Sequence, residues 1–375
     1  MKRIGIEVQR LFRKKKHGME VVALELIKEL QQIDKENEYV LFAKDDEDAQ
    51  CIRETEKFRI NKPGGYTYAD WEQWSLPREI KKEKIDFLHA TCNTAALNPG
   101  VPLMLTLHDI IYLESLNFKG TAYQNFGNIY RKFVVPKAVE KSKVIVTVSN
   151  FEKDTIIKRL KVPEEKVKVI YNAANPKFNN QYDKELVRQF KEKYKLPDSF
   201  ILFLGNTAPK KNTPNLIEAY IHYLNSVNNP EPLVVLDYDA ELVKNKLKEK
   251  NKSELIKWFV FPGFINASEM PLIYNAASLY VYPSLRESFG LPILEAMGCG
   301  TPVITSNTSS MPEIGGDAAI YIDPYNHVDI AEKMHSVLKD KDLQQDLSDK
   351  GVKRAAEFSW KTSATQLLDL YRSMP

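Results

Sequence analysis

The stretch SLRESFGLPILEAMGCGTPVIT, residues Ser284 to Thr305, predicts a loop, a helix and a strand in succession. The apolar runs SLYVYP before it and PVIT at its end are typical of buried strands. Gly290 allows a tight backbone, Pro292 suits the first helical turn, and Gly298 and Gly300 end the helix. Such a helix start presents free backbone N–H groups beside a loop of small residues. It therefore predicts a site for an anionic group such as a diphosphate.

Two carboxylates bracket this loop. Glu287 precedes it and Glu295 lies in the first turns of the helix, with seven residues between them. Taken alone, both acids could simply favour a helix N-terminus, where a carboxylate contributes about 0.3–1 kcal/mol. The complete string, however, resembles the donor-binding motif of the retaining glycosyltransferases of family 4, which have the GT-B fold. The polysaccharide-building, mannosyltransferase-like members of that family are the ones this chain is most similar to.

The resemblance assigns roles within the motif. It implies that Glu287 lies near the donor sugar, that Glu295 binds the ribose hydroxyls, and that the intervening loop amides hold the diphosphate. The donor-binding residues that it implies are Asn206, Lys210, Lys211, Phe264, Ile265, Arg286, Ser288, Phe289, Gly290, Leu291 and Glu295.

Length and composition agree with an ordinary globular protein of two domains. The chain has 375 residues, of which 43% are hydrophobic and 27% charged. A net charge of +3 is too small to indicate a nucleic-acid partner. Its cysteines, Cys51, Cys92 and Cys299, are widely spaced and form no C-x-x-C pair, which favours free thiols in a reducing compartment over disulfides or a zinc site. Without a signal-peptide core or an apolar run of roughly 20 residues, we expect a cytoplasmic protein, or one bound peripherally at the inner face of a membrane.

The resemblance covers nearly the whole chain and implies an α/β architecture of two Rossmann-like domains that face each other across a cleft. Residues 1–176 would form the N-terminal, acceptor-binding domain. Residues 177–357 would form the C-terminal, nucleotide-sugar-binding domain. The amphipathic C-terminal segment 358–375 would cross back as a helix onto the first domain.

A basic loop follows the first expected strand, Ile4–Val8. It runs from Arg10 to His17 and is closed by Gly18, before an amphipathic helix. Gly18 matches a family glycine in the interdomain cleft, so we expect it at the acceptor site. The cations could attract a phosphate-bearing acceptor or an anionic lipid surface, or they could form a solvated, mobile loop.

His108 and Asp109 end the expected strand Pro102–Asp109. Ligands bind at this edge of open α/β sheets. The resemblance implies that His108 takes part in catalysis and that Asp109 contacts the acceptor. A structural histidine oriented by its neighbour is the alternative. The WEQWSLP string from Trp71 also recurs in polysaccharide-building members, although a tryptophan pair on a helix is more often core.

Lys210 and Lys211 follow the expected strand Phe200–Leu204, and Asn212 or Thr213 is expected to cap the next helix. The family carries an Arg-Lys pair there that reaches the donor diphosphate, a role that lysine can fill as a point charge; a solvated pair is the alternative. Asn206 stands where many members have Arg, and Arg286 could replace that cation.

The expected chemistry is glycosyl transfer with retention. Lys210, Lys211 and the helix start would stabilise charge on the leaving diphosphate, with Glu287 positioning the sugar. By family analogy no metal or other cofactor is required. The donor would be a GDP- or UDP-sugar, with GDP-mannose a candidate, and the acceptor a glycan or a lipid-linked sugar in cell-surface polysaccharide synthesis. A two-carboxylate glycosidase and a catalytically silent nucleotide-sugar-binding subunit are the alternatives.

Overall fold

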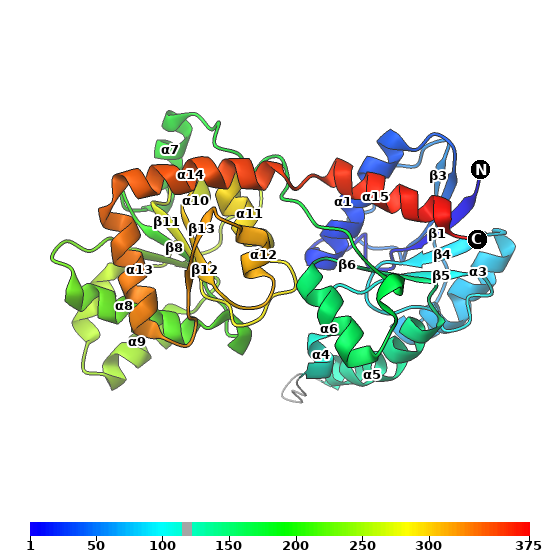
Figure 1. Cartoon of the computed structure of the whole chain (residues 1–375), viewed down its shortest axis with the longest axis horizontal. Coiled ribbons are helices and arrows are strands. Elements are labelled where there is room, and N and C mark those ends of the chain that lie inside the picture. The colour runs from blue at the N-terminus through cyan, green and yellow to red at the C-terminus, as the bar shows by residue number, and fades with distance from the viewer. Residues whose placement is uncertain (115–121) are drawn as a thin grey trace. The chain divides into compact units, whose positions relative to one another are not determined.

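A computed structural model describes residues 1–114 and 122–375 of the chain. The chain forms two compact units (Figure 1). Unit 1 contains residues 1–172 and 359–375, and unit 2 contains residues 173–358. The sequence placed these two boundaries after residues 176 and 357.

Unit 1 is built on a seven-stranded parallel sheet with the strand order β3-β2-β1-β4-β5-β6-β7. The strands are β1 (Arg3–Glu7), β2 (Glu38–Phe42), β3 (Phe58–Asn61), β4 (Phe87–Ala90), β5 (Leu103–Thr106), β6 (Val144–Thr147) and β7 (Val167–Val169). Its helices are α1 (Gly18–Ile33), α2 (Tyr68–Asp70), α3 (Leu76–Lys82), α4 (Ile111–Glu114), α5 (Ala122–Lys141), α6 (Asn150–Leu160) and α15 (Trp360–Ser373), with short turns at Trp71–Ser75 and Glu164–Lys166.

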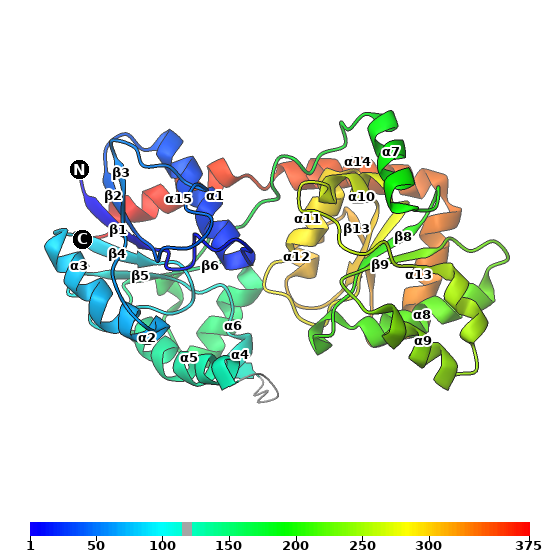
Figure 2. The ribbon, with the colours of Figure 1, turned by 180° about the vertical axis from the view of Figure 1, so that it is seen from behind.

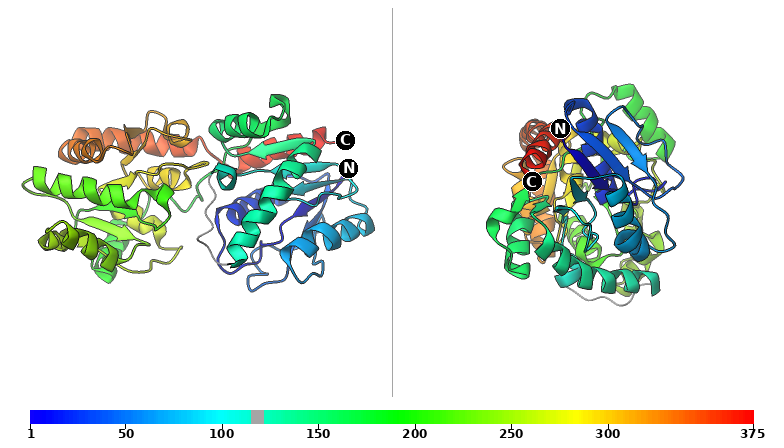
Figure 3. Two further views of the ribbon diagram at one scale, coloured as in Figure 1. Left: turned by 90° about the horizontal axis from the view of Figure 1, so that it is seen from below. Right: turned by 90° about the vertical axis from the view of Figure 1, so that its right-hand side faces the viewer.

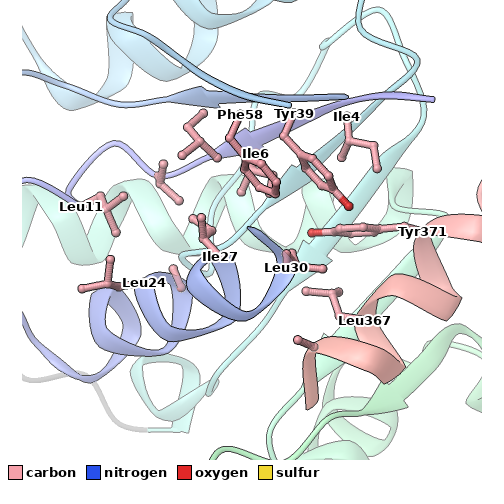
Figure 4. Close-up of a cluster of buried hydrophobic side chains, with 14 of the residues drawn as sticks. Ile4, Ile6, Leu11, Leu24, Ile27, Leu30, Tyr39, Phe58, Leu367 and Tyr371 are labelled. Atoms are coloured by element: carbon pink, nitrogen blue, oxygen red, sulfur yellow. The ribbon is translucent and has the colours of Figure 1, made fainter. Parts of the chain in front are cut away.

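The C-terminal helix α15 packs on α1 and so belongs to unit 1, as expected. Figure 4 shows the cluster that holds it, in which Leu367 and Tyr371 lie against Ile27 and Leu30 of α1. The Tyr371 hydroxyl also lies 2.6 Å from Nδ1 of His89 in β4, and both side chains are buried. The two buried polar groups thus satisfy each other between strand β4 and the C-terminal helix.

Unit 2 repeats this plan with a six-stranded parallel sheet in the order β10-β9-β8-β11-β12-β13. The strands are β8 (Ile201–Leu204), β9 (Leu233–Leu236), β10 (Phe259–Val260), β11 (Leu279–Tyr282), β12 (Val303–Ser306) and β13 (Ala319–Ile322). The helices are α7 (Lys184–Tyr194), α8 (Thr213–Ser226), α9 (Ala240–Glu249), α10 (Met270–Ala276), α11 (Leu291–Gly298), α12 (Met311–Gly315), α13 (His327–Lys339) and α14 (Lys341–Ala356), with 3-10 turns at Pro209–Lys211 and Ser253–Trp258.

Helices cover both faces of each sheet, which Figure 1 and Figure 2 show from opposite sides and Figure 3 from two further directions. Parallel strands buried on both faces need near-continuous apolar sequences, and LVVL at β9 and VITS at β12 are buried throughout. The α/β class and the two Rossmann-like sheets expected from the sequence are confirmed. Within the described residues, none of the helices combines the length and apolar character that a membrane crossing requires.

Each sheet has one switch point, where chain connections leave a central strand in opposite directions. In unit 1 it lies between β1 and β4, and in unit 2 between β8 and β11. Open α/β sheets bind ligands at this place, beyond the carboxyl ends of the strands. Ligand sites are therefore expected at these two switch points.

Candidate functional site

The switch point of unit 2 brings two loops together. One follows β8 and contains Lys210 and Lys211, and the other follows β11 and contains Glu287. The backbone N–H of Leu285 donates to the carbonyl of Lys210 at 2.7 Å, which fixes one loop against the other. Residues some 75 positions apart in sequence thus meet at one edge of the sheet.

Glu287 and the two lysines form a charge cluster. Lys211 Nζ lies 2.8 Å from Glu287 Oε1 and 2.9 Å from the Tyr282 hydroxyl, whereas Lys210 Nζ lies 3.5 Å from Glu287 Oε2. The Glu287 residue is only 8% exposed. Burial raises the pKa of this carboxyl, but Lys211 and Lys210 outweigh the effect and hold the pKa below its usual value. Glu287 is therefore ionised at neutral pH.

Two serines that the sequence did not single out hold the backbone of this loop. Ser309 Oγ accepts from the N–H of Glu287 at 3.0 Å. The hydroxyl of Ser310 donates to the carbonyls of Glu287 and Phe289 at 2.9 and 3.0 Å. Both serines follow β12, the neighbour of β11, so their position after an adjacent strand could have indicated them.

Gly290 starts helix α11 in a conformation that favours glycine, with φ +100°. The helix start offers fewer donors than expected, because Pro292 has no N–H and the N–H of Ile293 returns to the Gly290 carbonyl at 2.9 Å. In the part of the chain that the structure describes, the N–H groups of Gly290 and Leu291 have no partner. These two donors are the ones left for an anion.

Glu295 lies one turn into α11 in a different environment from Glu287. Its Oε2 accepts from the Tyr274 hydroxyl at 3.2 Å. Burial raises the pKa of Glu295 to about 7, although Tyr274 and the more distant Lys177 oppose the rise. The carboxyl is thus poised between its two forms at neutral pH.

The other residues predicted to bind the nucleotide-sugar donor also lie in unit 2. Arg286 donates from Nη1 to the Glu287 carbonyl at 3.0 Å, so this nitrogen supports the loop. Asn206 accepts from the N–H of Ala208 at 2.7 Å and shapes the turn after β8. Between β10 and α10, Phe264 is 77% exposed and Ile265 is buried. Ser288, Phe289 and Leu291 lie in the loop and at the start of α11.

Asn212 is the N-cap residue of helix α8, as expected, but the cap is not made by its side chain. Asn212 occupies the cap position but adopts φ +59°, and its side chain makes no capping bond. Its Nδ2 instead donates to the carbonyls of Pro283 and Pro324 at 3.1 and 2.6 Å. The Thr213 hydroxyl donates to the Asn206 carbonyl at 2.7 Å. Tertiary contacts of the site loops thus replace the local cap.

Asp237 directly follows strand β9. It takes the left-handed conformation with φ +54°, which aspartate tolerates better than most residues. Gly205 opposite has no room for a side chain, because a Cβ there would lie 2.6 Å from Tyr238 Cβ. The loops that follow β8 and β9 therefore approach each other closely at Gly205.

Unit 1 contains the other residues predicted to take part in catalysis or to bind the acceptor, namely His108, Asp109 and Gly18. His108 is buried, and its Nε2 lies 2.9 Å from the Thr91 carbonyl, so this nitrogen carries the hydrogen. Burial lowers the pKa of His108, which keeps it neutral at pH 7. Asp109 accepts from the N–H of Ile111 at 3.2 Å. Gly18 is exposed at the start of α1, and a Cβ there would meet nothing within 4 Å.

Part of the basic loop is committed to ion pairs. Lys14 Nζ lies 3.2 Å from Glu47, and Lys16 pairs with Asp48.

The tryptophans of the WEQWSLP string have different environments. Trp71 is fully buried, as a core residue would be, and its indole N–H donates to the Pro63 carbonyl at 2.9 Å. Trp74 is 62% exposed.

These features define a Rossmann-like α/β protein with a cation–carboxylate cluster at the switch point of its second sheet. The family model described as Glycosyl transferases group 1 matches residues 185–354, and the model described as Glycosyltransferase Family 4 matches residues 17–178. The chain therefore contains a Glycosyltransferase Family 4 domain followed by a Glycosyl transferases group 1 domain.

Among its relatives, O-antigen chain mannosyltransferase B of Escherichia coli is 32% identical over 247 residues, which cover 65% of this chain and 64% of that protein. The serotype-specific mannosyltransferase WbdA of Escherichia coli is 31% identical over 245 residues, which cover 64% of this chain and 30% of that protein. The chain thus matches less than two thirds of the length of either relative.

Solved structures share the fold at low sequence identity. Sucrose-phosphate synthase from Thermosynechococcus elongatus superposes with a TM-score of 0.73 at 18% identity and covers 100% of this chain and 99% of that one. Anabaena Alr3699/HepE in complex with UDP gives a TM-score of 0.73 at 18% identity, with 100% of both chains covered.

Proposed function

We propose that this chain transfers a sugar, with retention at the anomeric carbon, from a nucleotide-sugar donor to a glycan or lipid-linked acceptor. The donor is held at the β8/β11 switch point of unit 2. The observation that carries the proposal is the contact of Lys211 with the buried Glu287, 2.8 Å apart, in loops that also present the N–H groups of Gly290 and Leu291.

The charges fit the requirements of the reaction. When the bond from the sugar to the diphosphate breaks, negative charge grows on the leaving group. Preorganised cations and amides stabilise such charge most strongly in a site that excludes water. Lys211 and Lys210 supply the cations here, and Glu287 holds them in place before the donor binds. Because these groups provide positive charge, we propose that the reaction needs no metal ion.

Glu295 suits the ribose of the nucleotide. Two ribose hydroxyls can donate to a carboxylate, and such bonds favour its ionised form. Burial raises the pKa of Glu295 to about 7, because the hydrogen bond from Tyr274 and the charge of Lys177 do not compensate for the loss of solvent. Hydrogen bonds from the nucleotide would supply the missing stabilisation of the ionised carboxylate. Backbone groups at Phe264 and Ile265 are the proposed contacts of the nucleobase.

Unit 1 is proposed to bind the acceptor, with Gly18, His108 and Asp109 in that region. The names of the relatives point to mannosyl transfer in O-antigen or related polysaccharide synthesis. GDP-mannose is therefore the first donor to test, and UDP-sugars are the second, since the HepE complex contains UDP. A cytoplasmic location, with or without peripheral membrane contact, is part of this proposal.

One observation favours a second candidate. Glu287 and Glu295 have pKa values shifted in opposite directions, which is the arrangement by which two-carboxylate glycosidases keep one acid protonated and the other ionised. A glycosidase would need neither nucleotide nor Lys211. Measuring hydrolysis of simple glycosides separates this reading from transfer.

The decisive test combines binding and product analysis. Thermal shift with a panel of nucleotide sugars identifies the donor, because a ligand of the native state raises its apparent stability. The identified donor is then incubated with glycan acceptors with and without EDTA, and the anomeric configuration of the product is read by NMR. We expect a retained product in both cases. Donor binding without transfer to any acceptor would indicate a silent subunit, and hydrolysis without nucleotide would indicate a glycosidase.

A further inference from the structure

Unit 1 contains a pocket of about 610 Å³ at its own switch point. Its walls include Gln9 and Arg10, which follow β1, and Cys92 to Thr94, which follow β4. The volume lies within the roughly 300–1,000 Å³ typical of small-molecule sites. This pocket lies wholly within unit 1 and is separate from the cluster around Glu287.

Cations outnumber carboxylates among the charged residues that line the pocket. The cations are Arg10, Arg13, Lys44 and Arg131, and the carboxylates are Asp45 and Asp46. Asp45 is already paired with Lys62, at 2.6 Å. The lining therefore has an excess of cations, and three of them are arginines, whose planar guanidinium groups match phosphate oxygens in bidentate geometry.

Gln9 provides a second, independent indication of a ligand. The residue is 6% exposed and lines the pocket, and its backbone is fixed by bonds of its N–H to Glu7 at 2.9 Å and of its carbonyl to the N–H of Lys44 at 3.1 Å. Its side-chain Nε2, however, has no acceptor anywhere in residues 1–114 and 122–375. A buried amide donor without a partner is unfavourable unless a ligand oxygen completes it.

A hydrogen-bond network behind the pocket holds its walls in place. The buried Glu72 accepts from the hydroxyls of Tyr68, Thr94 and Tyr130 at 3.0, 2.5 and 2.5 Å, and from Gln73 at 2.9 Å. The Arg10 guanidinium lies 4.7 Å from the centre of the Tyr68 ring. This part of the pocket wall, Arg10 included, is therefore preorganised, which reduces the entropy lost on binding.

The neighbouring buried acid does not cancel the positive charge. Burial and the proximity of Glu72 raise the pKa of Glu7 to about 8, although Gln9 and Arg10 oppose the rise. Glu7 is thus mostly neutral at pH 7 and adds little negative charge beside the pocket.

We infer that this pocket binds a phosphate or diphosphate group carried by the acceptor, through Arg10, Arg13, Arg131 and the Gln9 amide. The inference rests on the proposed function, because it names the chemical class of the acceptor. The phosphate belongs either to a soluble sugar phosphate or to the headgroup of a lipid-linked sugar.

The test measures binding to unit 1 while the site in unit 2 is filled. The whole chain, in saturating GDP or UDP, is titrated by calorimetry with mannose 1-phosphate, with a short-chain alkyl diphospho-mannose, and with methyl mannoside. We expect at least one phosphate ester to bind tenfold or more tightly than the methyl glycoside, with affinity that falls as salt is added. Tight binding of the alkyl ester alone identifies a lipid headgroup, and tight binding of both esters identifies the phosphate itself.

Variants locate the binding. Arg131→Ala and Arg13→Ala are each expected to weaken the phosphate ester about tenfold, and Gln9→Glu, of nearly the same shape, to weaken it by at least as much. Arg53→Ala removes an exposed cation that does not line the pocket and should change nothing. Equal affinity for ester and methyl glycoside, or unchanged ester binding in all three pocket variants, would overturn the inference. If the nucleotide fails to bind while the ester binds as expected, the proposed function fails and the anion site stands.

Discussion

The two sheets of this protein have similar switch points, but the sites there use charge in opposite ways. In unit 2 the buried Glu287 is ionised and paired with Lys211 at 2.8 Å. In unit 1 the buried Glu7 and Glu72 have raised pKa values, and Glu72 accepts hydrogen bonds from neutral groups. Two lysines therefore hold the buried acid of unit 2 in its ionised form, whereas burial in unit 1 favours the protonated form of its acids, and cations outnumber carboxylates in the pocket lining.

This difference shows that topology selects the place of a site but not its electrostatics. In both sheets, loops after neighbouring parallel strands converge. The residue types in those loops then decide whether a buried acid is stabilised by a cation or by protonation. Substitution of Lys211 in unit 2 and of Glu7 in unit 1 tests this difference.

The largest effect is expected from Lys211→Ala. Loss of this cation should reduce turnover at saturating donor about 10²–10³-fold, the usual consequence of removing one group that stabilises a developing charge. Lys210→Ala is the matched control, since Lys210 Nζ is farther from Glu287, at 3.5 Å, and should have a smaller effect. Steady-state kinetics measure the turnover of both variants at saturating donor. An unchanged turnover for Lys211→Ala would show that Lys211 does not stabilise charge on the leaving diphosphate.

The acid of unit 1 predicts a pH effect on stability. The pKa of Glu7 is about 8 in the folded state, above its ordinary value of 4.5, so the folded state binds the extra proton. Its contribution is fully present below pH 4.5 and is lost as pH rises toward 8, by an amount on the order of 3 kcal/mol between pH 5 and 8.

Glu7→Gln should therefore flatten the fall in the free energy of unfolding between pH 5 and 8, measured with urea at each pH. Glu72 and Glu295 titrate in the same direction, so some slope is expected to persist. Identical slopes in the variant and the natural chain would show that Glu7 is ionised throughout this range.

Glu295 of unit 2 is expected to couple donor binding to pH. Glu295→Ala should weaken the nucleotide sugar by about 1–3 kcal/mol, through loss of charge-assisted hydrogen bonds. In the natural chain, affinity should rise with pH up to about 7 and then level off, because binding favours the ionised carboxylate. Calorimetry at several pH values would contradict the ribose role if Glu295→Gln kept the same affinity and the same pH profile.

The smallest effect on stability is expected at Gly18. No atom of the chain lies within 4 Å of the position of a Cβ there, so Gly18→Ala should change the free energy of unfolding by less than about 0.5 kcal/mol. If an acceptor approaches this backbone closely, the Michaelis constant for the acceptor should nevertheless rise. A variant with unaltered stability and unaltered acceptor kinetics would exclude Gly18 from the acceptor site.

The sequence predicted the fold of unit 2 and the segments that meet at its switch point, whereas the binding roles of their residues stay predictions. The apolar strands, Gly290 and the spacing of Glu287 and Glu295 all lie within one short stretch. The contacts that complete the site were not predicted. Ser309 and Ser310 reach the Glu287 loop only when β11 and β12 pair, and Tyr282 meets Lys211 only when β11 pairs with β8. Asn212 is the N-cap of α8, but its side chain bonds to Pro283 and Pro324 instead of capping the helix, for the same reason.

The pocket of unit 1 was harder to predict because its lining comes from separate segments. The basic loop was recognised, but the sequence could not divide it into Arg10 and Arg13, which line the pocket, and Lys14 and Lys16, which form ion pairs. Glu72 lies in the WEQWSLP string, yet only the fold shows that it organises Tyr68 and Tyr130.

The central prediction is that the diphosphate of the donor lies at the loop Glu287–Leu291. A crystal structure of the chain with its nucleotide sugar would test this. We predict phosphate oxygens at about 3 Å from Lys211 Nζ and from the N–H groups of Gly290 and Leu291, with the ribose at Glu295. Electron density for the nucleotide in the pocket of unit 1, or at any other place away from the loop Glu287–Leu291, would contradict it.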